Sequence, residues 1–359
     1  MSEGAYILNS VGSSYYQEAL ALINQVFRVS VGQEANMLES FPFMLKKENA
    51  QRMLCFIYKD EKLQSKRLVA VASYCILRIK SFSKEFDCAF IGSVCTDPQH
   101  EGKGLASSLI KEILRRLEQE SHISICSVSG TRSLYLLQGF KRLPAFKQYR
   151  YLLDERAAQD FDERHLQFLS DLTLEIHQPS DLSHEEIEQL YKLYLNLDIR
   201  FVLNLESFKQ ALISSTVPWG AYRFGILLCK KDEEIQAFCL YKCCEADKLD
   251  YSNGVKADGG LKLRFAHLIE VMEFACKAEL RIVDELLKYI LVCENADCLA
   301  YNVAFAYHDH PSSRHLLPKS YDECEQLNQA GSIWLRQESI RKELGYSLEL
   351  PWFEGIMYQ

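Results

Sequence analysis

The residues V-C-T-D-P-Q-H-E-G-K-G-L-A, from Val94 to Ala106, decide the fold of the first half of this chain. Upstream of them, the segment from Cys88 to Cys95 is apolar and predicts a buried strand. Downstream of the glycines, apolar residues recur every four positions, which predicts an amphipathic helix with one buried face. These apolar residues are Leu105, Leu109, Ile113 and Leu117.

Two glycines, Gly102 and Gly104, stand between the predicted strand and the predicted helix. Because glycine has no Cβ, a bulky anion can approach the backbone amides of this turn closely. The first N–H groups of a helix also lack partners within the helix and lie at the positive end of its dipole. The segment therefore predicts a cradle for a pyrophosphate, whereas the alternative is a tight connection with no ligand.

The order of these residues resembles motif A of the GNAT superfamily of acyl-CoA-dependent N-acyltransferases. In that family a V-x-T-x-P strand end precedes R-G-x-G-x-A/G, and a second signature reads L-Y-x-x-x-G-F. The second signature resembles L-Y-L-L-Q-G-F, Leu134 to Phe140, about thirty residues further on. The resemblance implies an α+β fold in which helices flank a central, mixed and mostly antiparallel sheet.

The resemblance also implies which residues bind acyl-CoA and move protons. The backbone at the end of the strand would pair with pantetheine, and one of its N–H groups would polarise the thioester carbonyl. The glycine turn and the start of the helix would bind the pyrophosphate, and Tyr135 would protonate the leaving thiolate as general acid. The implied cofactor-binding residues are Val94, Cys95, Thr96, Gly102, Lys103, Gly104, Leu105, Ala106 and Ser107.

One position departs from the family pattern. The first position of the family motif, Arg or Gln, falls here on Glu101. Gln99 begins a second string of the same form, but Pro98 before it favours the register on Glu101. A carboxylate beside a pyrophosphate is locally unfavourable, and Lys103 is placed to offset it.

The general base is left open by the sequence. Many family members carry a glutamate near the position of Gly92, and glycine has no side chain that can accept a proton. The remaining candidates are a chain of water molecules and four side chains: Glu34, Glu39, Asp87 and His100.

The first half divides into the elements that a GNAT domain contains, and we assign it to residues 1–153. The helices are expected over Tyr15–Phe27, around Ala35–Lys47 with a break near Pro42, over Leu105–Gln119 and over Leu134–Leu137. The strands are expected over Ala5–Asn9, Arg52–Lys59, Leu68–Ile79, Phe86–Thr96 and His122–Val128, and near Phe140–Leu143 and Gln148–Leu152.

Residues 154–171 are charged and free of glycine, which predicts a linker helix. Residues 172–359 then repeat the element order of the first half, so we expect a diverged GNAT-like domain, with an unrelated α+β domain as the alternative. Its strands are expected over Leu172–His177, Ala221–Cys229, Ile235–Cys244, Leu263–Phe274 and Cys298–Ala306, and its helices over Glu185–Tyr194, Leu205–Ile213 and Ile282–Val292. After Phe274 no glycine stands where a second cradle would lie, so we expect this half not to bind CoA.

Composition narrows the function further. The formal net charge of −8 argues against nucleic-acid binding, which requires a concentrated basic surface. The longest apolar run, Leu68 to Leu77, is too short to span a bilayer, and no secretory signal is evident near the N-terminus. Thirteen cysteines without an export signal indicate reduced thiols in a cytoplasm. The run from His308 to His315 has no known metal-ligand spacing, so we expect a solvated loop and no metal.

We therefore expect a cytoplasmic N-acetyltransferase that transfers an acetyl group from acetyl-CoA to a primary amine by direct attack. The alternatives are a catalytically weak or inactive CoA-binding protein and an enzyme that transfers a longer acyl chain. The amine acceptor, a small molecule or a protein, is left open, as is a homodimeric state. The terminal segment Phe353–Gln359 is a candidate to reach back into the groove of the first domain.

Overall fold

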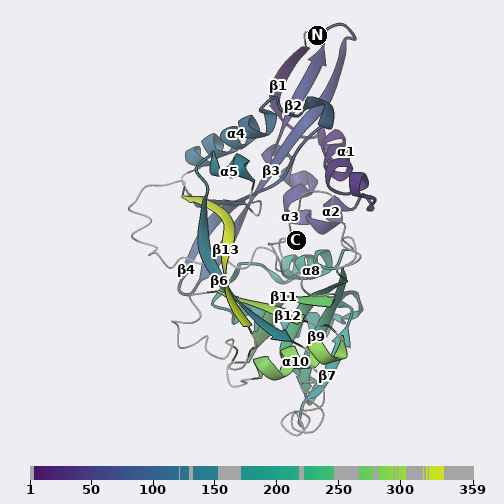
Figure 1. The fold of residues 1–359 in the computed structure, drawn as a ribbon, viewed down its shortest axis with the longest axis vertical. Coiled ribbons are helices and arrows are strands. Elements are labelled where there is room, and N and C mark those ends of the chain that lie inside the picture. Colours follow the sequence, from purple (N-terminus) through teal and green to yellow (C-terminus); the bar gives the residue numbers. More distant parts are fainter. Residues whose placement is uncertain are drawn as a thin grey trace. The chain divides into compact units, whose positions relative to one another are not determined.

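The structure is a computed structural model (Figure 1). It describes residues 4–120, 122–128, 132–152, 171–217, 222–245, 267–277, 282–294, 298–304 and 323–334, and the single residues 296, 318 and 321. The chain divides into two compact units. Unit 1 comprises residues 1–80, 84–143 and 329–347, and unit 2 comprises residues 81–83, 144–328 and 348–359.

The elements of unit 1 follow the order expected from the sequence. The strands are β1 (Gly4–Ser10), β2 (Met53–Asp60), β3 (Ser65–Ser81), β4 (Lys84–Thr96) and β5 (Ile123–Val128). The helices are α1 (Tyr16–Phe27), α2 (Met37–Ser40), α3 (Pro42–Leu45), α4 (Leu105–Gln119) and α5 (Ser133–Leu136), with 3-10 turns η1 (Val29–Val31), η2 (Lys47–Arg52) and η3 (Pro98–His100).

The sheet of unit 1 has the order β1-β2-β3-β4-β5. β1 and β3 pair with β2 in antiparallel register. β4 and β5 pair in parallel, because α4 carries the chain back between them. Figure 1 shows α4 and α5 on one side of this sheet and α1 to α3 on the other.

The buried face of α4 anchors this helix to the sheet. Its apolar side chains contact β2, β4 and β5. Full burial of one leucine or isoleucine side chain contributes roughly 1.5–3 kcal/mol, so this face is enough to hold the start of the helix in place. The buried residues are Leu105, Leu109, Ile110, Ile113 and Leu117, as the four-residue spacing predicts.

One prediction for the end of the first half is corrected by the structure. The strands expected near Phe140–Leu143 and Gln148–Leu152 form one strand, β6 (Lys141–Leu152), without a turn between them. The strand that pairs with β5 is instead β13 (Glu323–Trp334), through residues Gly331–Trp334. Unit 1 is thus completed by a strand from the far end of the chain, which the sequence analysis did not predict.

Unit 2 contains every strand and helix that the sequence analysis expected between residues 172 and 306, with boundaries shifted by a few residues. The strands are β7 (Thr173–His177), β8 (Ile199–Phe201), β9 (Arg223–Lys231), β10 (Glu234–Glu245), β11 (His267–Cys276) and β12 (Cys298–Ala304). The helices are α7 (His184–Leu195), α8 (Leu205–Ser214) and α10 (Val283–Cys293), with the 3-10 turn η4 (Pro179–Asp181).

The sheet of unit 2 has the order β7-β9-β10-β11-β12-β6. Every neighbouring pair is antiparallel except β11 and β12, which are parallel and joined through α10. In unit 1 the corresponding order is β1-β2-β3-β4-β5-β13, with β4 and β5 as the parallel pair. The two units therefore share one strand order, and each takes its last strand from the part of the chain that follows the other unit.

None of the described helices is long and apolar enough to cross a membrane. The cysteines whose side chains the structure describes are free thiols, and all of these are buried except Cys293.

Candidate functional site

The glycine turn of unit 1 adopts a conformation that glycine favours. Gly102 and Gly104 both have a φ of +73°, in the left-handed region that side chains with a Cβ adopt at a cost. A Cβ added at either position would meet no atom within 4 Å. The backbone here therefore has the left-handed conformation of a glycine turn and leaves open space beside it, which a bound pyrophosphate would need.

The N-terminus of α4 is left without a side-chain cap. Gly104 is the N-cap residue, and the first turn of the helix contains no acidic residue. Helices α7 and α8 of unit 2, by contrast, are capped by the side chains of Ser183 and Asn204. The first amides of α4 are thus available to an anion, which the helix dipole favours at this end.

Strand β4 contains one residue with a left-handed backbone conformation. Ser93 has a φ of +51°, an uncommon conformation for a residue other than glycine. Pairing between β4 and β5 runs from Asp87 to Ile91, opposite Val128 at the end of β5, while β4 continues to Thr96. The last residues of β4 therefore extend beyond the described end of β5. Nothing in the sequence singled out Ser93, because a positive φ at serine has no sequence signature.

The structure brings most of the expected site residues together. Val94, Leu105 and Tyr135 lie in one buried apolar cluster of unit 1. Gly102, Lys103 and Gly104 are exposed on the turn, and Thr96, Ala106 and Ser107 are half-buried beside it. The side chains of Val94 and Leu105 are core residues, so only their backbone groups can serve a ligand.

Cys95 is the one thiol among the expected site residues. It is buried, and burial raises the pKa of its thiol to about 12. A thiol with this pKa is protonated at neutral pH and is a poor nucleophile. The site therefore offers no activated cysteine at this position to carry the acyl group.

Tyr135 lies on α5 and is buried, with 7% of its surface exposed. Its ring packs edge-on against Phe140 at 5.9 Å between centroids. Burial raises the pKa of the phenol, so it stays protonated at neutral pH as a proton donor must. Its hydroxyl makes no hydrogen bond to any residue in the described part of the chain.

Two of the four candidate general bases are held in other interactions. Asp87 accepts hydrogen bonds from Arg78 at 2.9 and 3.2 Å, and these bonds lower the pKa of its carboxyl. Both ring nitrogens of His100 are engaged, one by Tyr6 and the other by Arg67. Glu34 and Glu39 are exposed near α2. Asp87 and His100 are therefore poor general bases. Of the candidates, Glu34, Glu39 and a chain of water molecules remain.

Lys103 does not pair with Glu101. Its ammonium donates instead to the hydroxyl of Tyr6 at 2.7 Å, and the two charged side chains make no ion pair with each other in the described structure. Glu101 is exposed on the turn. That the positive charge of Lys103 offsets the Glu101 carboxylate stays a prediction. In the structure, Tyr6 and not Glu101 is the hydrogen-bond partner of the ammonium.

The helix of unit 2 that corresponds to α4 has acidic residues in its first turn, whereas the first turn of α4 is uncharged. The first turn of α10 contains Asp284 and Glu285. Asp284 is buried and accepts a hydrogen bond from the hydroxyl of Tyr151 at 2.7 Å. Two carboxylates at the positive end of the helix occupy the place where a phosphate would otherwise be favoured.

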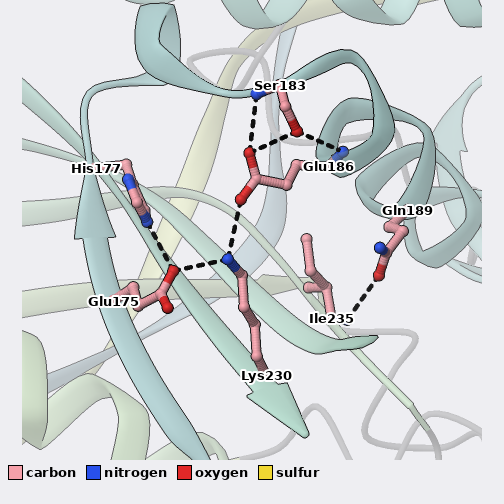
Figure 2. Close-up of polar contacts among 7 residues, drawn as sticks. All are labelled: Glu175, His177, Ser183, Glu186, Gln189, Lys230 and Ile235. Carbon is pink, nitrogen blue, oxygen red and sulfur yellow. Dashed lines mark hydrogen bonds and ion pairs between the residues drawn. The ribbon is translucent and has the colours of Figure 1, made fainter. Parts of the chain in front are cut away.

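A group of charged side chains in unit 2 has the composition of a metal site (Figure 2). Glu175, His177 and Glu186 offer ligand atoms within 4.8 Å of one another. Lys230 lies between the carboxylates, 2.7 Å from Glu175 and 2.9 Å from Glu186, and Ser183 donates to Glu186. The ammonium already supplies the positive charge, so these residues form an ion-pair network that ties β7 and α7 to β9.

Two segments that the sequence analysis considered, His308–His315 and Phe353–Gln359, lie outside the described residues, as does most of the expected linker helix.

Residues 8–140 match the family model described as the acetyltransferase (GNAT) domain. The match covers less than half of the chain; within residues 8–140 it supports a GNAT acetyltransferase domain and an acyltransferase as the class of enzyme. A comparison with curated protein sequences gives no significant match.

Solved structures with the same fold include a conserved protein from Enterococcus faecalis described as a probable N-acyltransferase. It has 12% sequence identity and a TM-score of 0.57, and the match covers 92% of this chain and 72% of that one. A GCN5-related N-acetyltransferase from Anabaena variabilis is 9% identical, with a TM-score of 0.55 and coverage of 92% and 73%. A third, from Kribbella flavida, is 13% identical, with a TM-score of 0.53 and coverage of 92% and 70%. At these identities the likeness concerns the fold.

Proposed function

We propose that this chain, which contains a GNAT acetyltransferase domain, transfers an acetyl group from acetyl-CoA to a primary amine. One observation carries the proposal. The N-terminus of α4 has no side-chain cap and follows two glycines with positive φ and open space beside them. Such a backbone is suited to binding the pyrophosphate of CoA.

The acyl-CoA is expected to lie along the end of β4. The amides of Leu105, Ala106 and Ser107 bind the pyrophosphate, together with the backbone of the glycine turn. The backbone of β4 from Val94 to Thr96 pairs with pantetheine. The left-handed conformation of Ser93 re-aims its neighbouring amides, and one of them polarises the thioester carbonyl.

The reaction proceeds by direct attack on the thioester. The neutral amine attacks the carbonyl carbon, and the C–S bond breaks as the tetrahedral intermediate collapses to the amide and the thiolate of CoA. Tyr135 donates its phenolic proton to that thiolate, the proton lost by the amine passes to water, and water returns a proton to the Tyr135 phenolate. The high pKa of Cys95 supports direct attack over an acyl-cysteine intermediate.

Unit 2 is proposed to be a diverged GNAT-like domain that does not bind CoA. It repeats the strand order of unit 1, and Asp284 and Glu285 lie at the start of the helix that corresponds to α4. We place the protein in the cytoplasm, because its described cysteines are free thiols.

A calorimetric titration of the full chain with acetyl-CoA tests the binding step. A release assay for free CoA thiol, run with a panel of small amines and lysine peptides, tests the transfer step. Binding with turnover supports the proposal, whereas binding without turnover on any amine favours a CoA-binding protein without activity. A folded chain that does not bind acetyl-CoA contradicts the proposal.

A further inference from the structure

A network of polar and aromatic side chains lies directly before the glycine turn. His100, in η3, is buried with 4% of its surface exposed. Its ring packs against Tyr58 of β2 and Tyr6 of β1, at 4.8 and 5.7 Å between ring centroids. Arg67 of β3 reaches the same ring from the other side, with Nη2 2.6 Å from Nε2. Three strands of the sheet thus converge on the residue that begins the turn.

The hydrogen bonds determine the proton positions in this network. Arginine has only donors, so Arg67 donates to Nε2 of His100, which is therefore unprotonated. A neutral imidazole then carries its proton on Nδ1, which lies 2.9 Å from the hydroxyl oxygen of Tyr6. Burial, together with Lys103 and Arg67 nearby, lowers the pKa of His100 and favours this neutral form.

The hydroxyl oxygen of Tyr6 also accepts a hydrogen bond from Lys103. The ammonium lies 2.7 Å from this oxygen and 5.4 Å from the centre of the Tyr6 ring. Lys103 stands between Gly102 and Gly104 and is exposed, so without this contact its long side chain would sample many rotamers. The tyrosine holds the one cation of the turn in place.

We propose that Tyr6 and His100 are positioning residues for acyl-CoA: they fix Lys103 beside the glycine turn, where its ammonium binds the pyrophosphate and offsets Glu101. The inference rests on the proposed function, because it assigns the ligand of this turn. A cation that is already ordered loses less side-chain entropy when the ligand arrives. The Arg67–His100–Tyr6 chain thus supports one flexible side chain from two strands of the sheet, β3 and β1.

Tyr6→Phe tests the proposal, because the ring and its packing remain while the acceptor for Lys103 is lost. Calorimetry should show CoA binding weakened about three- to tenfold, the range for the loss of one ordinary hydrogen bond, because Lys103 itself and its charge remain. Dephospho-CoA, which keeps the pyrophosphate but lacks the 3′-phosphate, should show the same loss. Tyr16→Phe is the control, because it also removes a tyrosine hydroxyl that is held by a structural hydrogen bond, to Leu45 at 2.8 Å, away from the turn.

A second background separates positioning from general stability. In a Lys103→Met protein, Tyr6→Phe should cause no further loss of CoA affinity, since the residue that it positions is gone. The salt dependence of CoA binding should be shallower in Tyr6→Phe than in the wild type. Nitrogen-15 NMR should show His100 as the Nδ1–H tautomer.

Four results would overturn the inference: unchanged or tighter CoA binding in Tyr6→Phe, an equal loss in Tyr16→Phe, additive losses with Lys103→Met, or an Nε2–H tautomer of His100. A loss confined to CoA and absent with dephospho-CoA would assign Lys103 to the 3′-phosphate and overturn it as well. If the folded wild type binds no CoA at all, the proposed function fails, and this inference fails with it.

Discussion

Gly104→Ala tests the anion cradle with the smallest available change. Gly104 has a φ of +73°, and its Cβ would project into space that holds no protein atom within 4 Å. Holding alanine in the left-handed region costs about 1–2 kcal/mol. The more restricted unfolded chain returns about 0.4–1 kcal/mol of this. We therefore expect the free energy of unfolding to fall by roughly 0.5–1 kcal/mol, so the protein stays folded.

The effect on CoA should be larger than the effect on stability. The new methyl group occupies the space through which a phosphate approaches the first amides of α4. Loss of one hydrogen bond from an amide to a charged oxygen costs about 1.5–3 kcal/mol, which corresponds to a tenfold or greater loss of affinity. Calorimetric titration with acetyl-CoA measures this loss directly, and urea unfolding measures the stability change.

Gly32→Ala is the matched control. Gly32 also has a φ of +73° and also has no atom within 4 Å of an added Cβ, but it ends η1, between α1 and α2. The two variants should therefore lose similar stability, whereas only Gly104→Ala should lose CoA affinity. Wild-type affinity in Gly104→Ala, or an equal loss in Gly32→Ala, would refute the reasoning.

Three further predictions concern single side chains. Tyr135→Phe should lower kcat about 10²-fold, the expected size of a general-acid contribution, with unchanged acetyl-CoA affinity and little change in stability. A rate within a few-fold of wild type, measured by thiol release, would remove the phenol from the mechanism. Glu101→Arg should tighten acetyl-CoA binding about two- to fivefold at low salt, and by less as the ionic strength rises. Titrations at several salt concentrations measure this effect, and weaker binding would contradict the assignment of the turn to the pyrophosphate. Lys230→Met should lower the free energy of unfolding by about 1–2 kcal/mol, because it removes the ammonium that both half-buried carboxylates share. Burial raises the pKa of Glu186, but its hydrogen bonds with Lys230 and Ser183 outweigh burial and hold it at about 2. This carboxylate therefore stabilises the fold above about pH 4.5, and its contribution is lost as the pH falls towards 2. In urea unfolding across this range, the free energy of unfolding should fall less steeply with pH in Lys230→Met than in the wild type. An unchanged pH dependence would contradict the network.

Local patterns of the sequence were enough to predict most elements of both units. The four-residue spacing from Leu105 to Leu117 predicted α4 with its buried face, and the break at Pro42 predicted the division between α2 and α3. The glycines at positions 102 and 104 predicted the turn before α4, and the structure adds that both have a positive φ. Each of these signals depends on residues within one or two turns of each other.

The pairing of β13 with β5 could not be predicted in the same way. Apolar periodicity identifies a strand but not its neighbour, and these two strands are about 200 residues apart in the chain. The expected strand near Gln148–Leu152 was therefore assigned to the first domain on its position in the chain alone. In the structure that segment is part of β6, which pairs with β12 of unit 2 instead.

The role of His100 could not be predicted from the sequence either. As a histidine before the glycine turn it qualified as a candidate general base, but its burial and its two hydrogen-bond partners come from β1 and β3. The partner of Lys103 was missed for the same reason, since Tyr6 lies nearly one hundred residues earlier. Contacts between distant segments decide what a side chain in a motif can do.

Hydrogen–deuterium exchange of the full chain, with and without acetyl-CoA, tests the central claim most directly. The account predicts that acetyl-CoA slows exchange at the end of β4, in the glycine turn and in the first turn of α4, from Val94 to Ser107, and leaves the start of α10 unchanged. Calorimetry on the same sample should give one acetyl-CoA per chain. Protection at the start of α10, two molecules bound per chain, or no protection between Val94 and Ser107 would contradict it.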